Sequence, residues 1–105
     1  MNIREKYMLK RMALGMTQKE FAAIAKVDEG VVSLFERGEY IDPPTCSAYT
    51  WNVESYIHGL DRVKYLKTRI IEETLLLSHE PEEDHLHTLS HLQIHVAKLN
   101  MMYVK

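Results

Sequence analysis

Three histidines near the carboxyl end of the chain have the spacing that metal chemistry requires. His87, His91 and His95 follow one another at intervals of four residues, so a helix would place them on one face. Imidazoles at that spacing can share a zinc or nickel ion. They would also lie broadly opposite a row of leucines, where solvated polar residues are expected, and this second interpretation is the favoured one. A third is a pH-sensitive oligomer, because adjacent imidazolium ions repel one another below about pH 6.5.

Other chemistry has little support in the sequence, and we predict no bound metal, no cofactor and no enzyme. Thr45, Cys46 and Ser47 have no histidine or carboxylate placed beside them by motif, and no glycine-rich loop could cradle a phosphate. The acidic pair Glu72-Glu73 is expected on solvated helix surface. The single cysteine, Cys46, excludes an internal disulfide.

The elements that must position any functional side chain are predicted to be helices. Thr17 and Glu20 have the spacing of a capping box, which satisfies two amide groups where a helix begins. The apolar residues 21, 24 and 27 share a face that residues 32 and 35 can meet across a turn. Asp28 suits the N-cap of a second helix, and Gly38 suits the residue just past its end. The pattern predicts helices over 18–25 and 29–37, after a first helix over 3–14.

The same segment resembles the XRE or phage-repressor (lambda-repressor-like) family of helix-turn-helix regulators. The likeness is dense from Gly15-Met16-Thr17-Gln18 to Glu36-Arg37-Gly38 and looser from 3 to 60. It implies that Ala22 lets the two helices cross closely and that Arg11 and Glu36 form an internal ion pair. Lys26 stands where the family usually has a glycine, at a steric cost. The alternative is that 18–37 is simply a pair of packed helices.

The resemblance implies that the start of the helix over 29–37 faces the bases of double-stranded DNA. Glu29 can accept a hydrogen bond from cytosine, Ser33 can bond to several base edges, and Val31 or Leu34 can pack on a thymine methyl. Gly30 would let the backbone approach the groove. The remaining expected contacts are to phosphates, from Gln18, Lys19, Lys26 and Arg37.

The charge of the chain fits DNA binding poorly. The formal net charge is −2, and residues 1–60 hold seven basic and eight acidic side chains. Proteins that depend on phosphate contacts are usually basic. The acidic residues Asp28 and Glu29 either cap the helix without touching DNA, or belong to a surface that has turned toward a protein partner.

The rest of the chain is predicted to be helical as well. Thr45 is expected to cap a fourth helix after a proline loop, with apolar positions at Cys46, Tyr49, Val53, Tyr56 and Leu60. Beyond residue 60, two amphipathic helices separated by 80–84 form a hairpin with too little core to be stable alone. The hairpin either buries its stripe against a second copy or folds back on the chain's own first helices. The residues predicted to mediate self-association are Leu66, Ile70, Leu89, Leu92, Val96, Leu99 and Tyr103.

These observations predict an all-α protein with two parts: a lambda-repressor-like helix-turn-helix domain over 1–60 and a C-terminal two-helix hairpin over 61–105. The expected function is sequence-specific transcription regulation, as a repressor, by a cytoplasmic homodimer or higher oligomer on a pseudo-palindromic operator. No membrane segment is predicted, since no apolar run is long enough to span a bilayer. The alternative is a protein-interaction module on the same fold, antirepressor or antitoxin-like, that binds a protein antagonist and binds DNA weakly or not at all.

Overall fold

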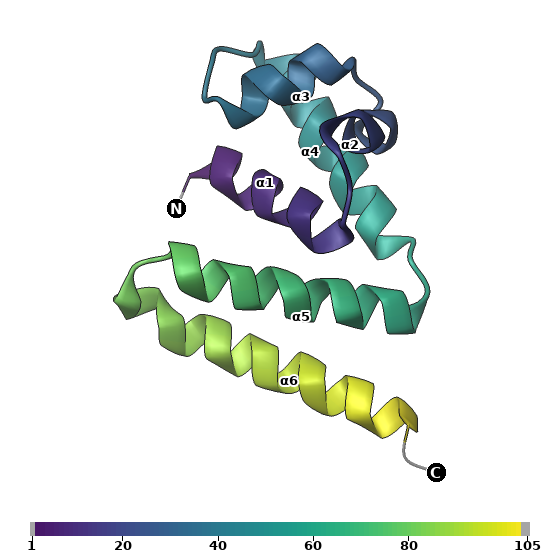
Figure 1. Cartoon of the computed structure of the whole chain (residues 1–105), viewed down its shortest axis with the longest axis vertical. Helices are drawn as coiled ribbons and strands as arrows, with labels where there is room; N and C mark the ends of the chain where they lie inside the picture. The colour runs from purple at the N-terminus through teal and green to yellow at the C-terminus, as the bar shows by residue number, and fades with distance from the viewer. Residues whose placement is uncertain (1, 104–105) are drawn as a thin grey trace.

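The protein is all-α. The computed structural model describes residues 2–103, and within that range it contains helices and no strands. The order of elements along the chain is α1 (Ile3–Leu14), α2 (Gln18–Ala25), α3 (Glu29–Glu36), α4 (Pro43–His58), α5 (Arg62–His79), the short 3-10 helix η1 (Glu82–Asp84) and α6 (His85–Tyr103). Figure 1 shows α1 to α4 gathered at one end, with α5 lying below α1 and α6 below α5.

Local sequence signals set the ends of the first helices. Thr17 and Glu20 form the predicted capping box, in which the Glu20 amide donates to Thr17 Oγ1 (3.1 Å) and the Thr17 amide donates to Glu20 Oε1 (2.9 Å). Gly15 ends α1 in a left-handed conformation with φ +68°. Lys26 ends α2 in the same region, with φ +58°. A glycine there would relieve the contact of the lysine Cβ with its own backbone, so this position carries a local strain.

The start of α4 differs from the prediction. The helix begins at Pro43, and its N-cap is Asp42, whose carboxylate accepts a hydrogen bond from the Thr45 amide at 3.1 Å. Thr45 was therefore wrongly expected to be the cap, and the two prolines lie inside the helix. They are tolerated because the first turn of a helix leaves its amide groups without partners, so a residue lacking an N–H loses nothing there.

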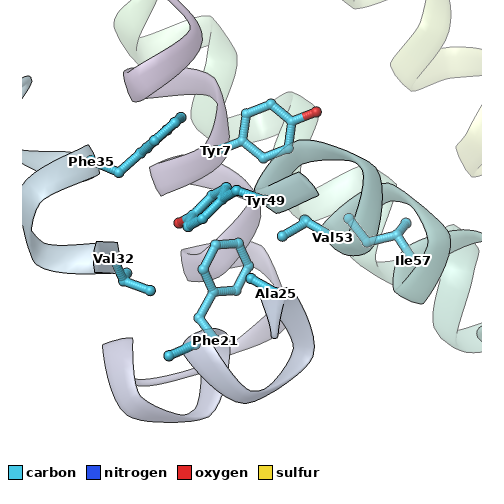
Figure 2. Packing of buried hydrophobic residues seen from close by; sticks show 9 residues of the cluster. Tyr7, Phe21, Ala25, Val32, Phe35, Tyr49, Val53 and Ile57 are labelled. Carbon is cyan, nitrogen blue, oxygen red and sulfur yellow. The ribbon is translucent and has the colours of Figure 1, made fainter. Parts of the chain in front are cut away.

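An aromatic core joins the four helices. Tyr49 of α4 is fully buried, stacks on Phe35 of α3 at 4.4 Å between ring centroids, and meets Phe21 of α2 and Tyr7 of α1 edge-on. Figure 2 shows these rings converging with Val32, Ala25 and Val53. Ring pairs of this kind add about 0.5–1.5 kcal/mol each beyond the burial of their area.

The buried stripe of α4 differs by one residue from the expected one. Tyr49 and Val53 are buried as predicted, and Ile57 follows them at 0% exposed, whereas Tyr56 is 37% exposed. Trp51 lies off the stripe and is 73% exposed. Ile57 continues the 3.6-residue period from Val53 at the spacing of four, which places Tyr56 at the edge of the contact.

The hairpin packs on the rest of the chain through α5. This helix lies between α1 and α6 (Figure 1). Lys10 of α1 is 8% exposed, and its Nζ lies 2.7 Å from Glu72 Oε2 of α5 and 3.1 Å from Glu54 Oε1 of α4. Arg69 Nη1 also donates to Glu72, at 2.8 Å. The hairpin is thus held to α1 by a buried cluster of charges as well as by apolar residues such as Leu66, which is 1% exposed.

No helix among residues 2–103 combines the length and the apolar character needed to cross a membrane.

Candidate nucleic-acid interface

The turn over 26–28 joins α2 and α3 so that their apolar faces meet. Ala22 is 4% exposed where the two helices approach one another, and Val32 of α3 is fully buried. The Val27 amide donates to the carbonyl of Ala22 across the end of α2. Asp28 precedes α3 in an extended conformation, but among the described residues its side chain makes no capping hydrogen bond. In the first turn of α3, Glu29 and Gly30 are exposed, whereas Val32 faces the core.

A network of polar side chains fixes the back of α3. Arg11 Nε donates to Glu36 Oε2 at 2.7 Å, and Arg11 Nη2 donates to Glu36 Oε1 at 3.0 Å, so the ion pair implied by the resemblance is present. Gln18 Nε2 donates to the same Oε1 at 3.1 Å. Arg4 Nη1 donates to the Glu36 carbonyl at 2.9 Å. Glu36 is 8% exposed. Charge-assisted, bidentate bonds of this kind orient two helices as well as stabilise them.

The residues expected to contact bases have unequal access to solvent. Glu29 and Gly30 are exposed, whereas Ser33 and Leu34 are half-buried. Val31 is half-buried and packs against the core, so only part of its side chain is accessible to solvent.

The residues expected to contact phosphates also differ among themselves. Lys19 and Lys26 are exposed. Gln18 points its amide group inward, to Glu36. Arg37 is exposed but bound, because its guanidinium donates to Ser33 Oγ at 2.7 Å and pairs with Glu39 at 2.6 Å. A phosphate would have to compete with that carboxylate.

Acidic residues precede, begin and follow α3. Asp28, Glu29, Glu39 and Asp42 are all exposed there. The hydroxyl and amide of Thr45 hold the pKa of Asp42 below its usual range, so this carboxylate stays charged well into acid. The surface that would face DNA thus carries a fixed negative charge near its cations.

Several buried ionic groups were missed in the sequence. Glu72 and Glu73 are each 5% exposed, so the expectation of a solvated acidic surface is wrong for both. Glu72 binds Lys10 and Arg69, and Glu73 Oε1 lies 2.7 Å from His95 Nδ1 of α6. A sequence signal does exist, since these two acids and Thr74 interrupt a run of isoleucines and leucines from 70 to 77. A charge inside such a run has to find a partner.

The histidine row is solvated in part, since His87 and His91 are exposed. The side chain of His95 is 13% exposed and contacts Glu73, which contradicts that interpretation for His95. The rings of His87 and His91 lie 4.4 Å apart, and both line a cleft between α1, α5 and α6. No cluster of three or more potential metal ligands occurs in the part of the chain that the structure describes.

The residues predicted to mediate self-association are divided between α5 and two sides of α6. The side chains of α6 that are buried or half-buried are His85, Thr88, Leu92, His95 and Leu99. Leu89, Val96 and Tyr103 remain 41%, 38% and 63% exposed. Leu66 is enclosed within the chain, and Ile70 is half-buried. An exposed apolar strip therefore remains on α6, next to the row that packs on α5.

No family model, curated protein or solved structure matches this chain. The likeness to helix-turn-helix regulators therefore rests on the residues from Gly15 to Gly38.

Proposed function

We propose that this chain is a small DNA-binding transcription regulator of the XRE or phage-repressor type. The observation that supports this most directly is the α2–α3 unit. Its inner side is fixed by Arg11, Gln18 and Glu36. The first two residues of α3, Glu29 and Gly30, are exposed. A rigid pair of helices with one exposed leading turn is what insertion into a major groove requires.

In this proposal one set of side chains positions the protein on the DNA, and another set recognises the base sequence. Lys19 and Lys26 contact phosphates beside α3, and Glu29 and Ser33 contact base edges. Arg37 exchanges Glu39 for a phosphate on binding, which makes the association depend strongly on salt. The proposed regulator is a cytoplasmic repressor.

We further propose that two copies associate through the strip formed by Leu89, Val96 and Tyr103 of α6. Their exposure in the single chain supports this, because burying such residues against one another would remove apolar surface from water. A pseudo-palindromic operator requires two copies of α3 about 34 Å apart, and the proposed dimer has to meet this spacing.

The test of DNA binding is a selection from genomic fragments with the purified full-length chain, followed by gel retardation at two salt concentrations. The expected result is an enriched sequence whose affinity falls as salt rises. Lys19→Gln should weaken binding to every sequence, whereas Ser33→Ala should alter the preference among sequences. Lys64→Gln is the matched control, since Lys64 is an exposed lysine of α5. If the selection enriches no sequence, the proposal fails.

The acidic surface favours a second candidate, a protein-interaction module of the antirepressor or antitoxin kind. Asp28, Glu29 and Asp42 would repel a phosphate backbone and suit a basic protein partner. This candidate predicts that Glu29→Lys strengthens binding to DNA and abolishes capture of a stoichiometric protein. If the chain is instead a DNA-binding regulator, Glu29→Lys should abolish its preference for the selected DNA sequence.

A further inference from the structure

A cleft of about 290 Å³ lies on one side of the hairpin, away from α3. Its floor is α5, which contributes Arg69, Glu72, Glu73 and Leu76. Its two walls are α1 and α6, the helices that flank α5 in Figure 1. Lys6 and Lys10 come from α1, and His87 and His91 come from α6. The volume is at the lower end of the range for small-molecule sites.

The two carboxylates of this cleft already have partners within the protein. Glu72 accepts from Lys10 and Arg69, at 2.7 and 2.8 Å. Glu73 lies 2.7 Å from His95, which is not itself in the lining. A cation entering the cleft would therefore have to displace an existing partner from each carboxylate.

Donor groups, in contrast, remain available. Lys6 is exposed and forms no ion pair with any residue between 2 and 103. Arg69 Nε is buried and has no hydrogen-bond acceptor among those residues. The neutral imidazoles of His87 and His91 can each donate one N–H. With three cations and two carboxylates in the lining, the formal charge of the cleft is positive even when both histidines are neutral.

We infer that this cleft binds a small oxyanion, a carboxylate or phosphate group carried by a molecule small enough to fit it. The oxyanion would lie between Lys6 on one wall and the imidazoles of His87 and His91 on the other. It would also give the buried Arg69 Nε an acceptor, and a buried donor without a partner is otherwise costly. This inference goes beyond the proposed function and does not depend on it.

The test is an NMR titration in which an anion is added to the whole chain and the chemical shifts of the backbone amides are recorded. Chloride keeps the ionic strength constant. Inorganic phosphate is the probe in one arm and succinate in the other. The expected result is a saturable shift of amides in 69–76 and 87–91. Saturation by phosphate alone identifies phosphate esters as the ligand class, saturation by succinate alone identifies carboxylates, and saturation by both identifies oxyanions in general.

Single substitutions in the lining show whether the anion binds in the cleft. Lys6→Gln and His91→Ala should each weaken the anion about tenfold, because each removes one hydrogen bond to a charged group. Lys67→Gln and His79→Ala are matched controls, since both residues are exposed and neither lines the cleft. The inference is overturned if neither anion saturates, if the shifts lie elsewhere, or if the controls weaken binding as much as the cleft variants do.

Discussion

Tyr49 carries a hydroxyl that is buried without a hydrogen-bond partner among residues 2–103. Burial raises the pKa of this phenol, and the nearby Glu36 carboxylate raises it further. The ring itself is well placed, stacked on Phe35 in the centre of the core (Figure 2). The hydroxyl therefore costs free energy while the ring contributes to stability.

We predict that Tyr49→Phe increases the free energy of unfolding by about 1 kcal/mol, because it removes an unsatisfied polar group without changing the shape of the ring. Urea denaturation measures this. Tyr7→Phe is the matched control, since the Tyr7 hydroxyl donates to Glu54 Oε1 at 3.2 Å. That variant should lose about 1 kcal/mol. Equal losses in both variants would show that Tyr49 has a partner in solution.

The ion pair between Arg11 and Glu36 gives a second prediction for single residues. Arg11→Met should lower the free energy of unfolding by about 3–5 kcal/mol, because it leaves the Glu36 carboxylate, 8% exposed, without its cation. The double variant Arg11→Met, Glu36→Leu should recover most of that loss, since it removes both charges. A denaturant series on the two variants measures the difference. No recovery in the double variant would contradict the prediction.

At the scale of the helices, the sequence predicted helix ends, which depend on neighbouring residues. It missed the ionic contacts of α5 with other helices, which depend on residues distant in sequence. The capping box of Thr17 and Glu20 and the left-handed end at Gly15 follow from residues within one turn. Arg69, three residues before Glu72, is a local partner. The other partners, Lys10 of α1 and His95 of α6, are distant in sequence, so the residues around Glu72 and Glu73 do not identify them.

For the candidate site, too, some side-chain contacts were predicted and others were not. The resemblance implied that Arg11 and Glu36 would meet, and they do. It could not show that Gln18 would join them or that Arg37 would bind Glu39, because both contacts depend on side-chain choices specific to this chain. The contacts of these residues with DNA stay a prediction.

The cap of α4 has a pH dependence that can be measured. The pKa of Asp42 is lowered in the folded chain by its bonds to Thr45, so its contribution to stability is present above the usual pKa of an aspartate and is lost as the pH falls through the folded value. Asp42→Ala should therefore lower the melting temperature at pH 7 and have progressively less effect in acid.

Asp42→Asn is the control for this cap, because the amide oxygen can accept from the Thr45 amide without a charge. It should retain more of the stability at pH 7 than Asp42→Ala does. Thermal unfolding followed by circular dichroism between pH 7 and pH 3 gives the comparison. A loss in Asp42→Ala that does not change with pH would contradict a role for the carboxylate charge.

For the whole molecule, the proposed dimer makes a direct prediction. Leu89→Glu combined with Val96→Glu should convert the dimer to a monomer in sedimentation, with an unchanged melting temperature of the single chain, because both side chains are partly exposed. Ile3→Glu is the control, since Ile3 is 50% exposed on α1, outside the hairpin. If sedimentation shows a dimer in the double variant, the strip on α6 is not the interface.

The two neighbouring residues Lys10 and Arg11 connect the most distant parts of the chain. Lys10 holds Glu72 of the hairpin, and Arg11 holds Glu36 at the end of α3. The hairpin and α3 are therefore both held by adjacent residues of α1. A tilt of the hairpin would therefore move adjacent residues of α1, and we expect the angle at which α3 is presented to shift with it.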